Sequence, residues 1–111
     1  MSSWAGRYAT RMTGAAYNAT KRAVLALSET INEEEGGRGI RSTVIMPGEV
    51  ATDILKSRPV PPSQADMDRM LQSGDLARTV RFVAESPAHV CLNEILISPT
   101  WNRFYQGMKE V

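Results

Sequence analysis

The clearest periodic pattern in the chain runs from residue 15 to about residue 35, a segment without Gly or Pro. Apolar or small side chains recur there at steps of three and four, which predicts one long amphipathic helix. The predicted stripe consists of Ala16, Thr20, Val24, Leu27 and Ile31. Gly36 and Gly37 follow, and glycine often ends a helix because it accepts a positive φ.

Two short apolar segments have the composition of buried strands. Residues 39–46 end in β-branched and apolar side chains and stop at Pro47. Residues 90–97 have the same character and stop before Pro99. Short apolar runs that are bounded by turn-forming residues favour buried strands.

The segment between the two predicted strands is expected to hold a loop and two helices. Residues 53–62 are rich in proline and predict a loop. Ser63, with Asp66 three residues later, resembles a capping box, which predicts a short helix that runs through Leu71. A Ser-Gly pair then interrupts the pattern, and Asp75 is expected to cap a further helix. The inward positions of that helix are Leu76, Val80, Val83 and Ala84.

The order of the predicted elements is helix, strand, loop with helices, and strand. Long helical patterns that alternate with apolar strands favour an α/β fold with a parallel sheet. Two strands are too few for a sheet that is stable by itself. We therefore expect further strands beside these two.

Composition excludes several classes of function. The 13 basic and 12 acidic residues leave a net charge of +1, which argues against nucleic acid or an acidic membrane surface as a partner. One Cys and one His exclude an internal disulfide framework and argue against a metal site. No apolar run is long enough to span a bilayer, and no secretory signal is evident. A cytoplasmic protein is expected.

Tyr17 and Lys21 form the first candidate for chemistry. They are four residues apart on the predicted helix and therefore share one face. A lysine ammonium close to a phenol favours the phenolate, so the tyrosine could give or take a proton in a reaction. The same spacing also fits a half-buried tyrosine beside a solvated lysine, and the motif alone does not decide between the two.

Several further motifs occur in a fixed order around this pair. Ser-Ser-x-Ala-Gly spans residues 2–6, Tyr-Asn-Ala-Thr-Lys spans 17–21, Pro-Gly-x-Val-x-Thr spans 47–52, and Asn-Glu-Ile-Leu-Ile-Ser-Pro-Thr spans 93–100. Together they resemble the C-terminal half of a short-chain dehydrogenase/reductase, over essentially the whole chain. An ordered set of motifs is much more specific than any one of them.

The resemblance implies a catalytic role for residues near the start of the chain. Tyr17 corresponds to the catalytic acid/base, and Lys21 to its electrostatic partner, which also hydrogen-bonds the nicotinamide ribose. Ser3 corresponds to the hydroxyl that binds and polarises the substrate oxygen. Ser2 remains a competitor for that role, because the spacing between the serine and Tyr17 is at the long end of the family's range.

The resemblance also implies a cofactor and a fold. The residues that would hold the nicotinamide of NAD or NADP are Pro47, Gly48, Val50 and Thr52. For Thr52 the alternative is a helix N-cap. Residues 53–74 correspond to a substrate lid, and the aromatic residues near the C-terminus to subunit contacts or a cover over the pocket. The implied fold is part of a Rossmann-like, doubly wound parallel sheet in three layers, α/β/α.

Features of the N-terminal half of such enzymes are missing. The Gly-rich turn that takes the pyrophosphate, the Asn-Asn-Ala-Gly segment and the residue that separates NAD from NADP do not occur in this sequence. We therefore expect residues 1–111 to be one partial domain without the N-terminal dinucleotide-binding strands, and a poor enzyme alone. The expected partner is a small alcohol or carbonyl substrate, and the parent protein is expected to be a homodimer or homotetramer. The alternative is a non-catalytic module that acts by self-association.

Overall fold

A computed structural model describes all residues 1–111 of the chain. The elements, in chain order, are helix α1 (Trp4–Arg7), helix α2 (Ala15–Glu35), the 3₁₀ turn η1 (Gly36–Arg38), strand β1 (Val44–Pro47), the 3₁₀ turn η2 (Asp53–Ser57), helices α3 (Gln64–Arg69) and α4 (Ser73–Ala84), strand β2 (Glu94–Ile97) and the 3₁₀ turn η3 (Arg103–Tyr105).

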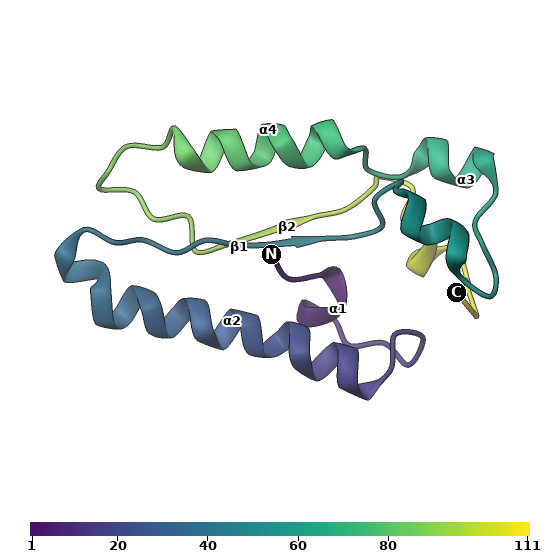
Figure 1. The fold of residues 1–111 in the computed structure, drawn as a ribbon, viewed down its shortest axis with the longest axis horizontal. Coiled ribbons are helices and arrows are strands. Elements are labelled where there is room, and N and C mark those ends of the chain that lie inside the picture. The colour runs from purple at the N-terminus through teal and green to yellow at the C-terminus, as the bar shows by residue number, and fades with distance from the viewer.

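The two strands form a parallel sheet that separates two layers of helix. β1 and β2 pair from Val44 opposite Glu94 to Pro47 opposite Ile97. Figure 1 shows α2 and α1 on one side of the sheet and α4 on the other. The connection through α3 and α4 lets the second strand run in the same direction as the first. The expected α/β class with a parallel sheet is confirmed.

The apolar core is small and lies between α2 and β1. Leu25 packs against Val44 and Met46, and the partly buried Val24 covers this group. Leu27, in the middle of the predicted stripe, is instead 61% exposed. Of the predicted stripe, Val24 packs against the core and Leu27 does not, because the centre of the face of α2 that packs lies roughly a quarter of a turn away from the stripe.

Polar contacts explain why α2 turns a different face toward the sheet than the predicted one. Ser28, which is buried, shares a hydrogen bond of 2.7 Å with the hydroxyl of Ser42. The amide nitrogen of Asn32 donates to the Ser42 carbonyl (2.9 Å), and the Ser42 N–H donates to Asn32 Oδ1 (2.7 Å). Buried polar groups must be paired, so these contacts turn Ser28 and Asn32 inward and leave Leu27 outside.

The same contacts shorten β1. Both peptide groups of Ser42 are bonded to Asn32, so they are not available to a ladder, and β1 begins only at Val44. The predicted strand over residues 39–46 is therefore too long at its start. The predicted strand over residues 90–97 is also too long at its start, since β2 begins only at Glu94.

The helix caps between the strands agree with the sequence at one helix and differ at the other. Ser63 caps α3 and accepts a hydrogen bond from the Asp66 N–H, as predicted. α4 begins earlier than predicted, at Ser73, with Gln72 as its N-cap. Asp75 sits three residues inside and accepts from the Gln72 N–H, in a reciprocal capping box. The Ser-Gly pair is thus the first turn of α4.

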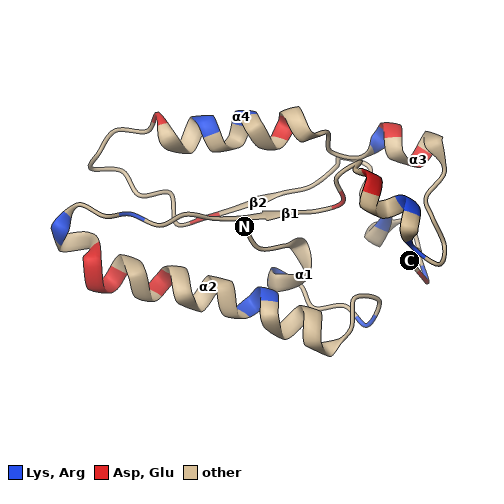
Figure 2. Ribbon diagram, viewed as in Figure 1, with Lys and Arg blue, Asp and Glu red and all other residues tan.

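Charged positions are interspersed along the helices and their connections (Figure 2). None of the helices combines the length and the apolar composition needed to traverse a lipid bilayer.

Arg41 ties the segment before β1 to the connection between α4 and β2. Its guanidinium donates to three carbonyl oxygens of that connection, those of Ser86 (2.8 Å), Pro87 (2.6 Å) and Val90 (2.6 Å). Hydrogen bonds from a charged donor are about twice as strong as neutral ones. This single side chain therefore aligns the return of the chain into β2.

We predict that Arg41→Met lowers the free energy of unfolding by about 2–3 kcal/mol, because charge-assisted hydrogen bonds are lost at once. Urea denaturation followed by circular dichroism measures this. Arg81→Met is the matched control, since the Arg81–Glu85 pair is exposed on both sides and should change stability by about 0.5 kcal/mol or less. Equal effects of the two substitutions would contradict the prediction.

Candidate active site

A cavity of about 620 Å³ opens beyond the carboxyl end of β1. It lies between α1, the start of α2, the loop after β1, η2 and the C-terminal segment. All of the sequence-predicted site residues except Lys21 line it, namely Ser3, Tyr17, Pro47, Gly48, Val50 and Thr52. Another cavity, of about 730 Å³, lies between α4 and β2 and contains none of them. We place the candidate site in the former because it gathers the groups that can react.

The two serines at the start of the chain have different environments. Ser3 caps α1, and its Oγ accepts a hydrogen bond from the Ala5 N–H (3.2 Å). A serine hydroxyl that accepts still has its own hydrogen to donate, and Ser3 lines the cavity. Ser2 is 3% exposed and donates its hydroxyl to the Lys21 carbonyl (2.7 Å). The geometry therefore favours Ser3 as the residue that can meet a substrate.

Tyr17 lies in the first turn of α2 and lines the cavity, and the residue is 43% exposed. The Lys21 ammonium is 5.6 Å from the centroid of the Tyr17 ring, although Lys21 itself is not part of the lining. The lysine thus stands one turn behind the tyrosine. Asn18, next to Tyr17, donates to the Thr10 carbonyl (2.8 Å) and holds the preceding loop against the helix.

The loop after β1 leaves polar groups without partners inside the chain. Thr52 takes the N-cap position of η2, but its side chain makes no capping hydrogen bond. Val50 forms a one-residue bridge with Leu71, in which the hydrogen bonds come from its neighbours Glu49 and Ala51. The peptide groups of Val50 itself therefore face away from Leu71. Both residues can offer hydrogen bonds to a bound molecule.

Gly6 permits the close approach of α1 and α2. A Cβ at this position would lie 2.9 Å from the Lys21 carbonyl oxygen and 3.0 Å from its carbon, and would also collide with the Ser2 hydroxyl. Only a residue without a side chain lets the two helices meet there. Since Ser3 caps one helix and Tyr17 belongs to the other, this contact determines how near they stand.

Sequence reasoning missed the charged part of the cavity wall. Glu49 and Arg58 both line the cavity, and Glu49 is paired with Arg58 and with Arg103. Hydrogen bonds from Arg103 to Glu49 raise the pKa of Arg103. At the exposed Asp53–Lys56 pair, the hydrogen bond between the two side chains lowers the pKa of Asp53 and raises the pKa of Lys56. Glu49 and Arg103 are 54 residues apart, so no local pattern signals their contact.

The C-terminal aromatic residues divide between two roles. Phe104 lines the cavity and stacks on Trp4, with ring centroids 6.5 Å apart and an interplanar angle of 7°. Trp101 instead lies against the guanidinium of Arg69. Of the expected cover over the pocket, the structure therefore shows Phe104. No three His, Cys, Asp or Glu side chains lie close enough together to hold a metal ion.

Comparisons with known proteins agree with this geometry. The sequence profile of short chain dehydrogenases matches residues 1–61. The chain belongs to the short-chain dehydrogenase family. It is 34% identical to the farnesol dehydrogenase of Aedes aegypti over 90 residues, which is 79% of this chain and 35% of that protein.

Solved structures of the family share the fold. A betaketoacyl-ACP reductase from Bacteroides thetaiotaomicron superimposes with a TM-score of 0.65 at 33% identity, over 76% of this chain and 36% of that one. The closed form of a serine dehydrogenase complexed with NADP⁺ superimposes with a TM-score of 0.71 at 25% identity, over 88% of this chain and 42% of that one. The chain thus spans less than half of these relatives and corresponds to the C-terminal part of the family's three-layer sheet.

We predict that Gly6→Ala lowers the free energy of unfolding by about 1–3 kcal/mol, because the added methyl group must push α1 away from Lys21. Urea denaturation measures the loss. Gly74→Ala is the matched control, because its Cβ would meet only the Arg78 guanidinium at 3.6 Å, within the first turn of α4. There alanine should stabilise by about 0.5–1 kcal/mol. A change in the free energy of unfolding that has the same sign at both positions would show that the contact with Lys21 does not determine the effect at Gly6.

Proposed function

We propose that the chain carries the catalytic and nicotinamide-binding part of an NAD- or NADP-dependent oxidoreductase that interconverts an alcohol and a ketone or aldehyde. One observation supports this above the others: Ser3 and Tyr17 line the same cavity as the loop from Pro47 to Thr52, with Lys21 one turn behind the tyrosine. The relatives named above, a farnesol dehydrogenase and a serine dehydrogenase, are named for substrates that carry a hydroxyl group.

The proton chemistry falls to Tyr17. In reduction its phenol donates a proton to the carbonyl oxygen, and in oxidation the phenolate takes the proton of the alcohol. The ammonium of Lys21 stabilises the negative charge that the tyrosine carries when its proton has left. Ser3 donates its hydroxyl hydrogen to the same substrate oxygen, which orients the carbonyl and stabilises charge that develops on it.

The loop after β1 fits the nicotinamide end of the cofactor. The hydroxyl of Thr52 and the peptide groups of Val50 are unpartnered in the chain, and they suit the amide of a carboxamide group. When bound, the nicotinamide ring would supply or accept the hydride. The task of these residues is to hold the reacting atoms about 3–3.5 Å apart, in an orientation that permits transfer.

We predict that Tyr17→Phe reduces turnover of a simple ketone by about a hundredfold or more, because the general acid is lost while the ring remains. Calorimetric titration of the folded chain with NADPH and with NADH, followed by the assay, provides the measurement. Cofactor binding should be unchanged in the variant. Tyr105→Phe removes the same atom from a tyrosine outside the cavity lining and should retain activity. Measurable turnover by the unchanged chain that Tyr17→Phe retains in full would refute the role of Tyr17.

A second candidate function is self-association through α2. The observation that favours it is the exposed face of α2 that carries Ala16, Thr20 and Leu27, of which Leu27 is 61% exposed. A long helix that exposes such a face gains from burial against a second copy. The surface could act in this way whether or not the cavity is catalytic.

We predict that Leu27→Glu shifts the chain from dimer to monomer, because a carboxylate would be buried in the contact. Sedimentation over the micromolar range measures the change. Ala26→Glu, on an exposed neighbouring position of α2, should leave the assembly unchanged. An unsubstituted chain that is monomeric throughout this range excludes the association.

A further inference from the structure

Glu49 is the most enclosed carboxylate at the cavity. Its side chain is 8% exposed, and both of its oxygens are bonded. Arg103 donates to it twice, from Nε to Oε1 (2.7 Å) and from Nη2 to Oε2 (2.9 Å), and Arg58 Nη1 donates to Oε2 (3.0 Å). Two-point pairing of a guanidinium with a carboxylate specifies orientation as well as distance.

Glu49 contacts both ends of the lid segment, which we define as residues 53–74, with its side chain at one end and its backbone at the other. Its side chain binds Arg58 near the start of the lid segment. Its carbonyl oxygen accepts a hydrogen bond from the Leu71 N–H (3.1 Å) near the end, and the Leu71 carbonyl accepts from the Ala51 N–H (2.8 Å). The lid segment is therefore closed at its base on the loop that follows β1.

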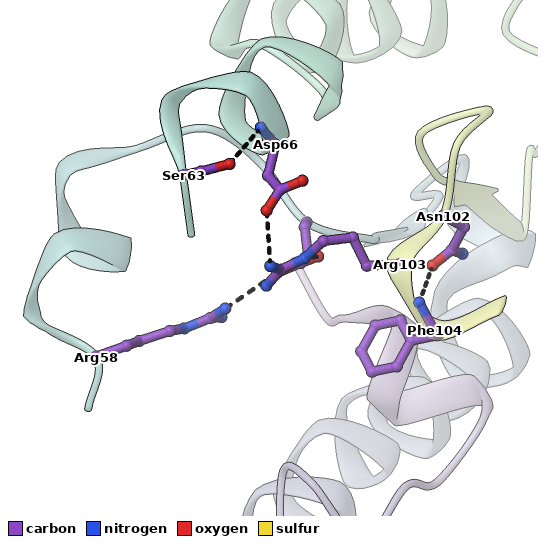
Figure 3. A network of polar contacts seen from close by, with 7 residues as sticks. Arg58, Ser63, Asp66, Asn102, Arg103 and Phe104 are labelled. Carbon is purple, nitrogen blue, oxygen red and sulfur yellow. Dashed lines mark hydrogen bonds and ion pairs between the residues drawn. The ribbon is translucent and has the colours of Figure 1, made fainter. Parts of the chain in front are cut away.

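The C-terminal segment, residues 98–111, joins the lid segment at the same place. Arg103 is 14% exposed and also lies 3.5 Å from the Asp66 carboxylate of α3. Figure 3 shows Arg103 reaching from the C-terminal segment toward Arg58 and Asp66. The next residue, Phe104, lines the cavity and stacks on Trp4. The position of Arg103 thus determines where this aromatic wall stands.

The charges of this cluster are balanced, with two guanidinium groups against two carboxylates. Removal of one partner from a largely buried ion pair leaves the other charges without compensation. Loss of Glu49 would leave Arg103 with Asp66 alone and Arg58 without an ion-pair partner. The segments that carry these arginines would then part from the loop after β1, while α2 has no member in the cluster.

We propose that Glu49 is a positioning residue that holds the lid segment and the C-terminal segment together as one wall of the cavity. This wall faces Ser3 and Tyr17, so Glu49 determines how a substrate can lie between the wall and the reacting groups. The coupling of the segments rests on the contacts alone, whereas its effect on a substrate rests on the proposed function.

Hydrogen–deuterium exchange, resolved by segment, tests the coupling without any turnover. In Glu49→Gln the amides of the lid segment and of the C-terminal segment should exchange about tenfold faster or more, because a charged hydrogen-bonding partner is lost. Exchange in α2 and β1 should be unchanged. Glu85→Gln, in an exposed pair with Arg81, is the matched control and should leave both segments as they are.

Further variants keep the test informative if Glu49→Gln folds poorly. Arg58→Gln, at a side chain 31% exposed, should accelerate exchange near the start of the lid segment only. Arg103→Gln should accelerate exchange in both segments, and Arg103→Lys should not restore protection, since lysine cannot bind both carboxylate oxygens in a fork.

Two outcomes would overturn the proposal. One is faster exchange spread evenly through α2 and β1 as well, which would mean that the cluster serves general stability only. The other is unchanged protection of both segments in Glu49→Gln and Arg103→Gln. Because neither measurement involves a reaction, an inactive chain would count against the proposed function and not against this coupling.

Discussion

The close approach of α1 to the backbone of Lys21 is the contact on which the candidate site depends. The Ser2 hydroxyl is bonded to the Lys21 carbonyl, and Gly6 leaves no side chain between the helices. The bond from the Ser2 N–H to the Ile45 carbonyl (2.8 Å) and the stacking of Trp4 on Phe104 hold α1 from its other sides. The same residue, Lys21, thus presents its carbonyl to one helix and its ammonium to Tyr17. Lys21 therefore takes part both in the packing of α1 and in the contact with Tyr17.

The parallel sheet explains why the site lies where it does. In open α/β sheets, ligands bind beyond the carboxyl ends of the strands. β1 ends at Pro47, and the loop that follows contributes to the cavity floor at once. The loop is too short to leave the cavity before it reaches the lid segment, which explains how the residues proposed for the cofactor and those proposed for the substrate come to lie side by side.

The sequence predicts local features of this protein well and distant ones poorly. The bounds of α2, the cap at Ser63 and the Tyr17–Lys21 pair depend on residues a few positions apart, and the structure contains them all. The rotation of α2 was missed because Asn32 is bonded to Ser42, a polar contact that hydrophobic periodicity does not register.

The charged wall was missed for a related reason. Glu49 and Arg103 look like ordinary surface residues in a chain with many charges, and nothing near either one marks it as buried. Their contact exists only once the lid segment and the C-terminal segment have been folded over the loop after β1. Local sequence patterns cannot reveal a contact between residues so far apart in the chain. The order and spacing of the motifs could still identify the residues that line the neighbouring cavity.

The bridge between Val50 and Leu71 has a consequence for how such a domain can change. Because the intervening chain is closed at its base, the entropy of closing it grows only slowly with length, by about 0.6 kcal/mol for each doubling. The stretch between Arg58 and Ser63 could thus be lengthened at little thermodynamic cost, provided that Arg58, Asp66 and Leu71 keep their contacts. The fold thereby separates a loop that can be lengthened from the frame that carries Ser3 and Tyr17.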